Sequence, residues 1–255
     1  MNKNIFIFFF NGTATTEIYT LSLPDALPIY GTTNFMNGLP VFASSIGILY
    51  RGWPMAAAMY VPWPNPEGGF VLHCRKGGGC FADDEAVSVY VSDEPVPSRL
   101  IGVPGYFGVG QGFTGKLAGK AGEVRTTGSI AYELAMTARG VLQYAMFGAP
   151  RLWDMAAGVL AVVEAGGTVM TRFKGERRWH PMECLVPSWE EKTPTMKDLR
   201  GWTAPLVAGN PKVATMIAEN VKRRFSLSSQ LRKLTRPLRR RKKKPETKPE
   251  AETKT

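Results

Sequence analysis

The sequence lacks the residues that several common scaffolds and sites require. It has only three cysteines, Cys74, Cys80 and Cys184, which is an odd number without paired spacing. This argues against a disulfide framework and favours a reducing compartment, so we expect a cytoplasmic protein. The two histidines and these cysteines have no spacing typical of a zinc site. No run of about 18 uninterrupted apolar residues occurs, so we expect no transmembrane helix.

A charge imbalance is also missing from most of the chain. The formal net charge is +11, but residues 222–255 contain 14 Lys and Arg against 3 Glu and account for all of it. The globular part is therefore neutral, and residues 226–255 are expected to be a basic disordered tail. Residues 222–244 could simply be solvated, or they could bind nucleic acid or an anionic membrane without specificity.

Short apolar runs bounded by glycine, proline and asparagine come first in the globular part. Residues 41–50 and 55–63 are predicted to be buried strands joined by a turn, and residues 68–81 add a third strand with a glycine turn. Residues 39–91 are therefore expected to form an antiparallel meander. A domain boundary is expected near residues 93–98.

Helical patterns dominate the second half of the chain. Residues 128–140 should form a helix that Ser129 caps and Gly140 ends, with one apolar stripe through Ile130, Leu134, Ala135 and Ala138. Glu133 on this helix is expected to be solvated or to have a capping role. The other elements expected here are a strand from residue 98, a helix over 153–167, a strand over 168–171, and a strand and last helix within 199–225. This pattern indicates an α/β layer.

The most informative feature is a set of short motifs in a fixed order. They are GTTNF at residues 31–35, TTGSIAYELAMTARG at 126–140, LWDMAAG at 152–158 and VVEAGG at 162–167. Together they resemble the inositol monophosphatase superfamily of magnesium-dependent phosphatases, from Gly31 to about Val221. The resemblance implies an α/β fold, namely the layered α/β/α/β/α sandwich of the sugar phosphatases, with its first domain incomplete.

The resemblance also implies roles for individual residues. Backbone N–H groups of Gly31, Thr32 and Thr33 would bind the phosphate, and the Thr32 hydroxyl would help to orient the attacking water. Asp154 would be a ligand of magnesium, the implied cofactor, although an aspartate at a helix start could also be a plain cap. The residues expected to border the substrate are Gly128, Ser129 and Ile130.

Departures from the family pattern put activity and substrate in doubt. In the family the loop reads Asp-Pro-(Ile/Leu)-Asp-Gly-Thr-Thr-Asn-Phe, and its two carboxylates fall here on Leu27 and Tyr30. Magnesium ions favour several oxygen ligands each, so Asp154 alone cannot hold the two or three ions that the chemistry needs. Phe147 stands about where inositol-selective members have a glutamate that contacts the sugar. We therefore expect this chain to be inactive or nearly so.

Residues 11–29 suggest a reason for the missing carboxylates. They resemble the conceptual translation of a common short-read sequencing adapter, from which they differ at Gly12 and Pro24. Replacing the first base of an Asp codon by T, the next base of the adapter, gives a Tyr codon and would explain Tyr30. Residues 1–29 are therefore interpreted as a non-native leader fused to a truncated gene. The alternative is a natural pseudoenzyme that diverged at the loop.

These observations predict four segments and one principal function. The segments are the leader (1–29), the remainder of an N-terminal α+β domain (30–94), a C-terminal α/β domain (95–225) and the tail (226–255). The function is magnesium-dependent hydrolysis of a small sugar, inositol or nucleotide phosphate, with that phosphate ester as partner and a homodimer suggested by the resemblance. The alternative is a non-catalytic protein that attaches to nucleic acid or an anionic membrane through its tail.

Overall fold

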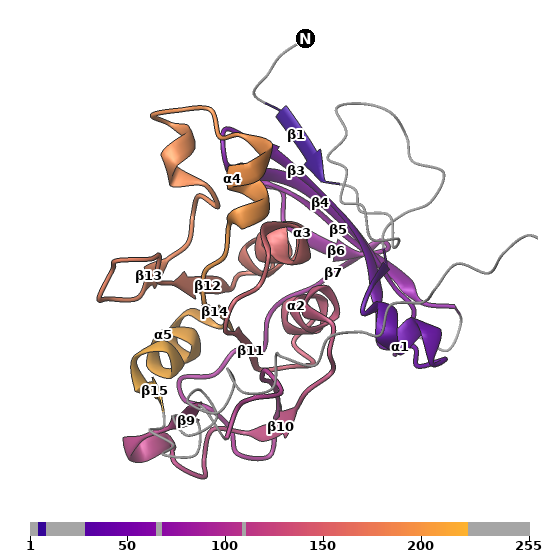
Figure 1. Ribbon diagram of the computed structural model, residues 1–255. Coiled ribbons are helices and arrows are strands. Elements are labelled where there is room, and N and C mark those ends of the chain that lie inside the picture. The colour runs from indigo at the N-terminus through magenta and orange to yellow at the C-terminus, as the bar shows by residue number, and fades with distance from the viewer. Residues whose placement is uncertain (1–4, 9–28, 65–67, 109–110, 224–255) are drawn as a thin grey trace, which may run out of the picture.

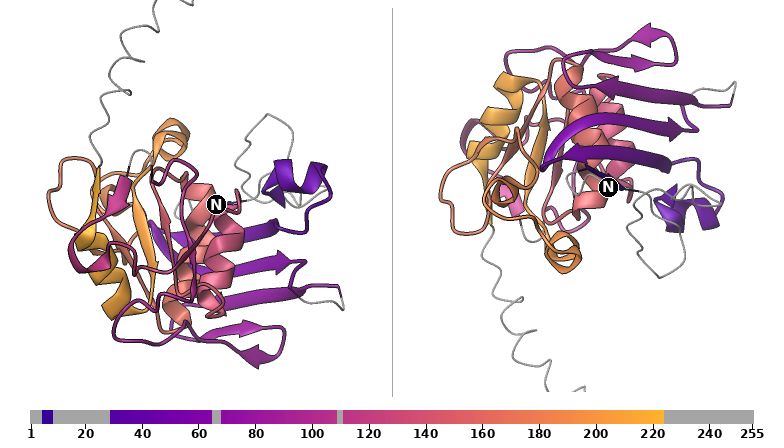
Figure 2. Two further views of the ribbon diagram at one scale, coloured as in Figure 1. Left: turned by 90° about the horizontal axis from the view of Figure 1, so that it is seen from below. Right: turned by 90° about the horizontal axis from the view of Figure 1, so that it is seen from above.

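The computed structural model describes residues 5–8, 29–64, 68–108 and 111–223 (Figure 1). The predicted tail lies outside these residues, as does the predicted leader apart from Ile5–Phe8 and Ile29. The described chain forms two large sheets with helices between them, a further helix against the second sheet, and a separate two-stranded sheet (Figures 1 and 2). The predicted α/β sandwich is confirmed, and in the described residues its layers run sheet, helix, sheet, helix.

The first sheet is the predicted antiparallel meander. Its consecutive strands are β3 (Ala43–Tyr50), β4 (Trp53–Val61), β5 (Phe70–Arg75), β6 (Cys80–Ala82) and β7 (Glu85–Ala86). Two strands from earlier in the chain, β1 (Ile5–Phe8) and β2 (Ile29–Tyr30), pair antiparallel with β3. Buried and exposed side chains alternate along β5, because one face of the sheet covers the core and the other faces outward.

The second sheet is mixed. Its order is β10 (Glu123–Arg125), β8 (Leu100–Gly102), β11 (Tyr144–Phe147), β14 (Leu206–Gly209), β12 (Thr168–Thr171) and β13 (His180–Pro181). Strand β11 lies near its centre, although no strand was predicted between the two long helices. All four β11 residues are buried, so the segment has no alternation of apolar and polar residues that could mark it as a strand. A two-stranded ribbon of β9 (Gln111–Phe113) and β15 (Val221–Arg223) lies beside this sheet.

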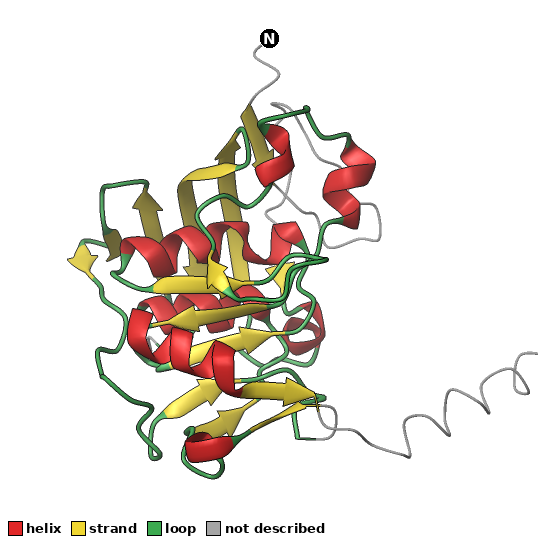
Figure 3. Cartoon of the chain, turned by 90° about the vertical axis from the view of Figure 1, so that its left-hand side faces the viewer, coloured by secondary structure: helices red, strands yellow, loops and turns green. Residues whose placement is uncertain are grey.

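Helices α2 (Ile130–Ala138) and α3 (Leu152–Glu164) form the layer between the sheets (Figures 2 and 3). Ser129 caps α2 and Gly140 follows its end with a φ of 69°, as predicted. The residues of the apolar stripe predicted for α2 pack in the core, but they are only part of the buried surface, because every residue from Ala131 to Ala138 is buried. The helix is covered on more than one side, so small alanines serve where a surface helix would have polar residues.

The helix layer is closely packed at Gly158 of α3. A Cβ atom built on Gly158 would lie 2.5 Å from the Cβ of Leu134 on α2. Glycine is therefore needed where the two helices meet, and this explains the last glycine of the LWDMAAG motif in packing terms.

The remaining helices lie outside this layer. They are α1 (Thr32–Met36), α4 (Met196–Gly201) and α5 (Pro211–Asn220), together with 3-10 turns at Gly115–Leu117 and Pro187–Trp189. Helix α5 packs on β12 and β14, on the face of the second sheet that is opposite to α2 and α3 (Figure 1). No helix in the described residues has the length and hydrophobicity needed to cross a membrane.

Candidate functional site

The GTTNF motif forms a turn and one short helix at the edge of the first sheet. Gly31 follows β2 with a φ of 92°, and α1 begins at Thr32. A Cβ atom on Gly31 would lie 2.9 Å from the Cβ of Ser129 and 3.1 Å from the backbone oxygen of Val41. Both the backbone conformation and the close approach therefore require glycine at this position.

Asn34 and Ser129 join this turn to the start of α2. The Asn34 side-chain amide donates to the backbone oxygens of Val41 and Thr127, each at 2.7 Å. The Ser129 hydroxyl donates to the backbone oxygen of Tyr30 at 2.9 Å and accepts from the Tyr132 N–H at 3.4 Å. These bonds bring together two motifs that are almost a hundred residues apart in the sequence.

The two threonines of the motif are exposed at the start of α1. The first N–H groups of a helix have no partner within the helix, so the amides of Thr32 and Thr33 are suited to an anion. The Thr32 hydroxyl donates to the backbone oxygen of Ile29 at 3.0 Å. With its hydrogen used in this way, the hydroxyl can interact with a water molecule only as an acceptor.

The residues predicted to border the substrate differ in exposure. Gly128 is exposed and has a φ of 79°, whereas Ile130 is half-buried and packs against the core. Ser129 is only 2% exposed, and both hydrogen bonds of its hydroxyl are made within the protein. Its hydroxyl therefore positions the Gly31 turn and caps α2.

Glu133 supports the same turn from within α2. The solvated role expected for it is wrong, because the residue is 4% exposed and its carboxylate accepts from the Thr127 N–H at 2.9 Å and the Thr127 hydroxyl at 2.7 Å. Burial raises the pKa of Glu133 from 4.5 to about 7, and the two bonds from Thr127 oppose this rise. The capping role that the sequence also allowed is closer to what is observed, although the bond goes to the N–H of Thr127, two residues before the cap residue Ser129.

Asp154 lies in the first turn of α3 and is half-buried. Its Oδ2 accepts from the Arg151 N–H at 3.2 Å, which is a capping bond. Burial raises the pKa of Asp154, while the hydrogen bond and the positive charge of Arg151 oppose the rise. The carboxylate also acts on Tyr30, whose pKa is raised well above its usual value first by burial and then by the negative charge of Asp154.

Tyr30 occupies the position where the family pattern has a carboxylate. The residue is 8% exposed and belongs to the main hydrophobic core. Its raised pKa keeps the phenol neutral, and a neutral buried phenol is a poor ligand for magnesium, which prefers carboxylates, carbonyls and water. No group of three or more His, Cys, Asp or Glu side chains within the described ranges could hold a metal ion. The residues described here do not fit a magnesium centre of two or three ions.

The sequence and fold were compared with those of known proteins. The model of the inositol monophosphatase family matches residues 28–203. The chain is 34% identical over 155 residues to "Phosphatase IMPL1, chloroplastic" from Arabidopsis thaliana. The matched segment covers 58% of this chain and 42% of that protein. This chain is also 29% identical over 205 residues to "Nus factor SuhB" from Escherichia coli K12. That match covers 78% of this chain and 67% of that protein.

Solved structures give the same assignment of fold. The crystal structure of the extragenic suppressor protein suhB from Bartonella henselae superimposes with a TM-score of 0.56 at 23% identity, covering 86% of this chain and 73% of that one. The chain spans about half the length of the first curated relatives that it matches. Because the family model matches well over half of the sequence, the chain belongs to the inositol monophosphatase family.

Proposed function

We propose that the chain contributes the phosphate-binding turn and one carboxylate of a phosphomonoesterase site of the inositol monophosphatase type. The observation that carries this proposal is the exposed turn at Gly31, which hydrogen bonds of Asn34 and Ser129 hold against the start of α2. The negative charge of Asp154 contributes to the raised pKa of Tyr30, and this supports Asp154 as the acidic group of the site. The substrate class would be a small sugar, inositol or nucleotide phosphate.

Each residue of the turn has a role that follows from its bonding. The amides of Gly31, Thr32 and Thr33 would bind the phosphate oxygens. The Thr32 hydroxyl, which donates to the backbone oxygen of Ile29, would accept one hydrogen of a water molecule and so orient the oxygen of that water. The bonds of Asn34 and Ser129 would keep the turn in place while a substrate binds.

We further propose that the chain in its present form is inactive or nearly so. Family members use magnesium ions, which would supply a hydroxide nucleophile and stabilise the leaving oxygen. In this chain Leu27 and Tyr30 stand at two of the carboxylate positions, and the Tyr30 phenol is buried and neutral. Asp154 alone offers too few oxygens for such ions.

The test restores the two carboxylates. Calorimetric titration with Mg²⁺ should show no specific binding to the unaltered chain or to Y30F, and clear binding to the L27D/Y30D variant. Adding D154N to that variant should weaken Mg²⁺ binding at least tenfold. Because Y30D places a polar group in the core, circular dichroism must first establish that each variant is folded. Equal Mg²⁺ binding with and without Asp154 would show that Asp154 is no part of the site.

Activity provides a second readout of the same proposal. Phosphate release should be measured with an inositol phosphate, a nucleoside bisphosphate and a sugar bisphosphate, each with magnesium present. The unaltered chain should release no phosphate above background from any of them. Turnover by the unaltered chain that D154N abolishes would contradict the proposed inactivity while supporting the site.

A non-catalytic function is the second candidate. One relative is named as a Nus factor, and residues 222–255 of this chain carry a net charge of +11. Such a segment would attract nucleic acid or an anionic membrane through phosphate contacts that weaken as salt concentration rises. Deleting residues 226–255 and measuring DNA and vesicle binding at two salt concentrations tests this function. Unchanged binding after the deletion would exclude the tail as the binding segment.

A further inference from the structure

A pocket of about 630 Å³ opens at the end of the second sheet where β11 and β12 finish. Strands β11 and β12 both pair antiparallel with β14, and their last residues, Phe147 and Thr171, are both opposite Leu206. The two strands therefore finish at the same end of the sheet, and ligands commonly bind outside the carboxyl ends of strands in α/β sheets. The pocket walls come from the end of β11, from residues 172–177 and 179 after β12, from the segment before β14, and from Gln111 and Val221 of the β9–β15 ribbon.

Positive charge dominates the wall formed by residues 172–177. Arg172, Lys174 and Arg177 line the pocket, and Glu176 is the one acidic residue among its lining residues. All three cationic side chains are exposed, and none takes part in an ion pair within the described chain. Their charges are therefore available to a bound anion.

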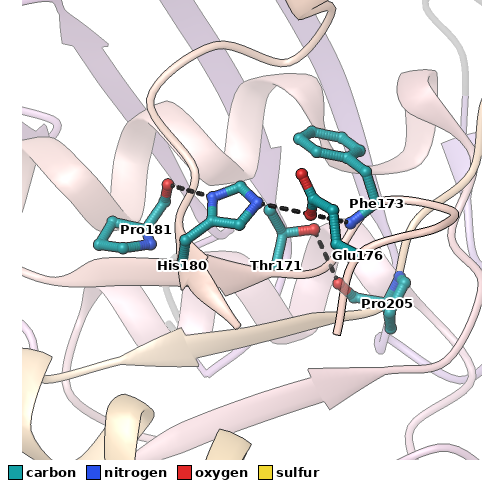
Figure 4. Close-up of polar contacts among 6 residues, drawn as sticks. All are labelled: Thr171, Phe173, Glu176, His180, Pro181 and Pro205. Atoms are coloured by element: carbon teal, nitrogen blue, oxygen red, sulfur yellow. Dashed lines mark hydrogen bonds and ion pairs between the residues drawn. The ribbon is translucent and has the colours of Figure 1, made fainter. Parts of the chain in front are cut away.

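Glu176 is held by bonds within its own loop. One of its carboxylate oxygens, Oε2, accepts from the Phe173 N–H at 2.7 Å and lies 2.8 Å from Nε2 of His180 (Figure 4). Nδ1 of His180 lies 3.0 Å from the backbone oxygen of Pro181, so both ring nitrogens face acceptors and both bonds form fully only when the ring is protonated. When His180 is protonated, its charge matches that of Glu176, and the pocket wall then keeps the three positive charges of Arg172, Lys174 and Arg177.

The cationic loop is also anchored to its surroundings. The Thr171 hydroxyl, where the loop begins, donates to the backbone oxygen of Pro205 at 3.0 Å (Figure 4). The Phe173 ring contacts those of His180 and Trp202, with centroids 5.6 and 6.3 Å apart. The Arg172 guanidinium stacks over Trp179 at 5.4 Å from the ring centroid. Because the backbone is held at several points, less ordering is needed when an anion binds.

We propose that this pocket binds a small molecule with two or more linked phosphate groups. Three cations in one wall match several negative charges better than a single phosphate, and the volume suits a metabolite-sized ligand. None of the lining residues belongs to the turn at Gly31 or to the first turn of α3. Phe147, which stands about where inositol-selective family members contact the sugar, does line the pocket, so the D154N variant is needed to tell this site from the proposed phosphatase site.

The test is calorimetric titration of the full chain with inorganic pyrophosphate, and with orthophosphate for comparison. Pyrophosphate should bind at least several-fold more tightly than orthophosphate. K174Q and R177Q should each raise the dissociation constant by about three- to tenfold, since each removes one charge-assisted contact at an exposed site. Both side chains are exposed, so the variants should unfold at the temperature of the unaltered chain.

Two matched variants separate a built site from diffuse charge. Arg178 belongs to the same loop but does not line the pocket, so R178Q should change pyrophosphate affinity by less than about twofold. D154N should leave the affinity unchanged, which separates this site from the proposed phosphatase site. An R178Q effect as large as that of K174Q would overturn the proposal in favour of general electrostatic attraction, as would the absence of pyrophosphate binding at millimolar concentration.

Discussion

Replacement of Glu133 by glutamine should remove a large part of the pH dependence of stability. Burial raises the pKa of this carboxyl from 4.5 to about 7. The folded state therefore binds the proton more tightly than the unfolded state, and the resulting stabilisation is fully present below pH 4.5 and lost as the pH rises through 7. Glutamine keeps an acceptor for the two bonds from Thr127 and does not titrate.

The expected magnitude follows from the two pKa values. One pKa unit corresponds to about 1.4 kcal/mol, so between pH 5 and pH 8 the Glu133 carboxyl should lower the free energy of unfolding by about 2 to 3 kcal/mol. E133Q should lack this part of the change. Any cost of burying the glutamine NH₂ group is the same at both pH values, so it cancels when the two pH-dependent changes are compared.

Urea denaturation at pH 5 and pH 8, with matched ionic strength, measures the effect. From pH 5 to pH 8, the free energy of unfolding of the unaltered chain should fall by about 2 to 3 kcal/mol more than that of E133Q. E123Q, which removes an exposed carboxylate of β10, is the control and should behave like the unaltered chain. Identical pH profiles for E133Q and the unaltered chain would refute the assignment of a buried, proton-binding Glu133.

Two further predictions concern the helix layer and the turn. G158A should lower the free energy of unfolding by about 1 to 3 kcal/mol, because the new methyl group would lie 2.5 Å from the Cβ of Leu134; G201A, where nothing lies within 4 Å, should be nearly neutral by urea denaturation. N34D should lower the free energy of unfolding by about 1 to 3 kcal/mol and speed amide hydrogen exchange around Ser129, because a carboxylate cannot donate to the two backbone oxygens that the Asn34 amide contacts. Unchanged exchange would show that the two Asn34 hydrogen bonds do not hold the turn.

Much of the fold could be predicted from local pattern. The meander over residues 39–91 has apolar runs separated by glycine turns, and the register of β3 to β7 agrees with that interpretation. The caps of α2 were visible because Ser129 and Gly140 stand directly at its ends. Strand β11 was missed because four consecutive buried residues look alike in a buried strand and a buried helix.

The site was less accessible to sequence reasoning. Family resemblance predicts that Gly31, Thr32 and Asp154 belong to one site, and this stays a prediction. The buried role of Glu133 and the hydrogen bonds of Asn34 depend on which loops meet in space, and no local pattern encodes that. The role of residues 172–177 as a pocket wall likewise depends on β11 and β12 finishing at the same end of the sheet, and no local pattern predicts that.

The helix layer also limits how this molecule can open. Helix α3 touches β3, β4 and β5 on one side and β12 and β14 on the other, and it meets α2 at Gly158 without space for a methyl group. Rotation of one sheet against the other would have to unlock this contact, and close-packed interiors resist such gradual deformation. We therefore expect motion at the periphery of the molecule, such as in the single turn that starts at Thr32, rather than within the helix layer.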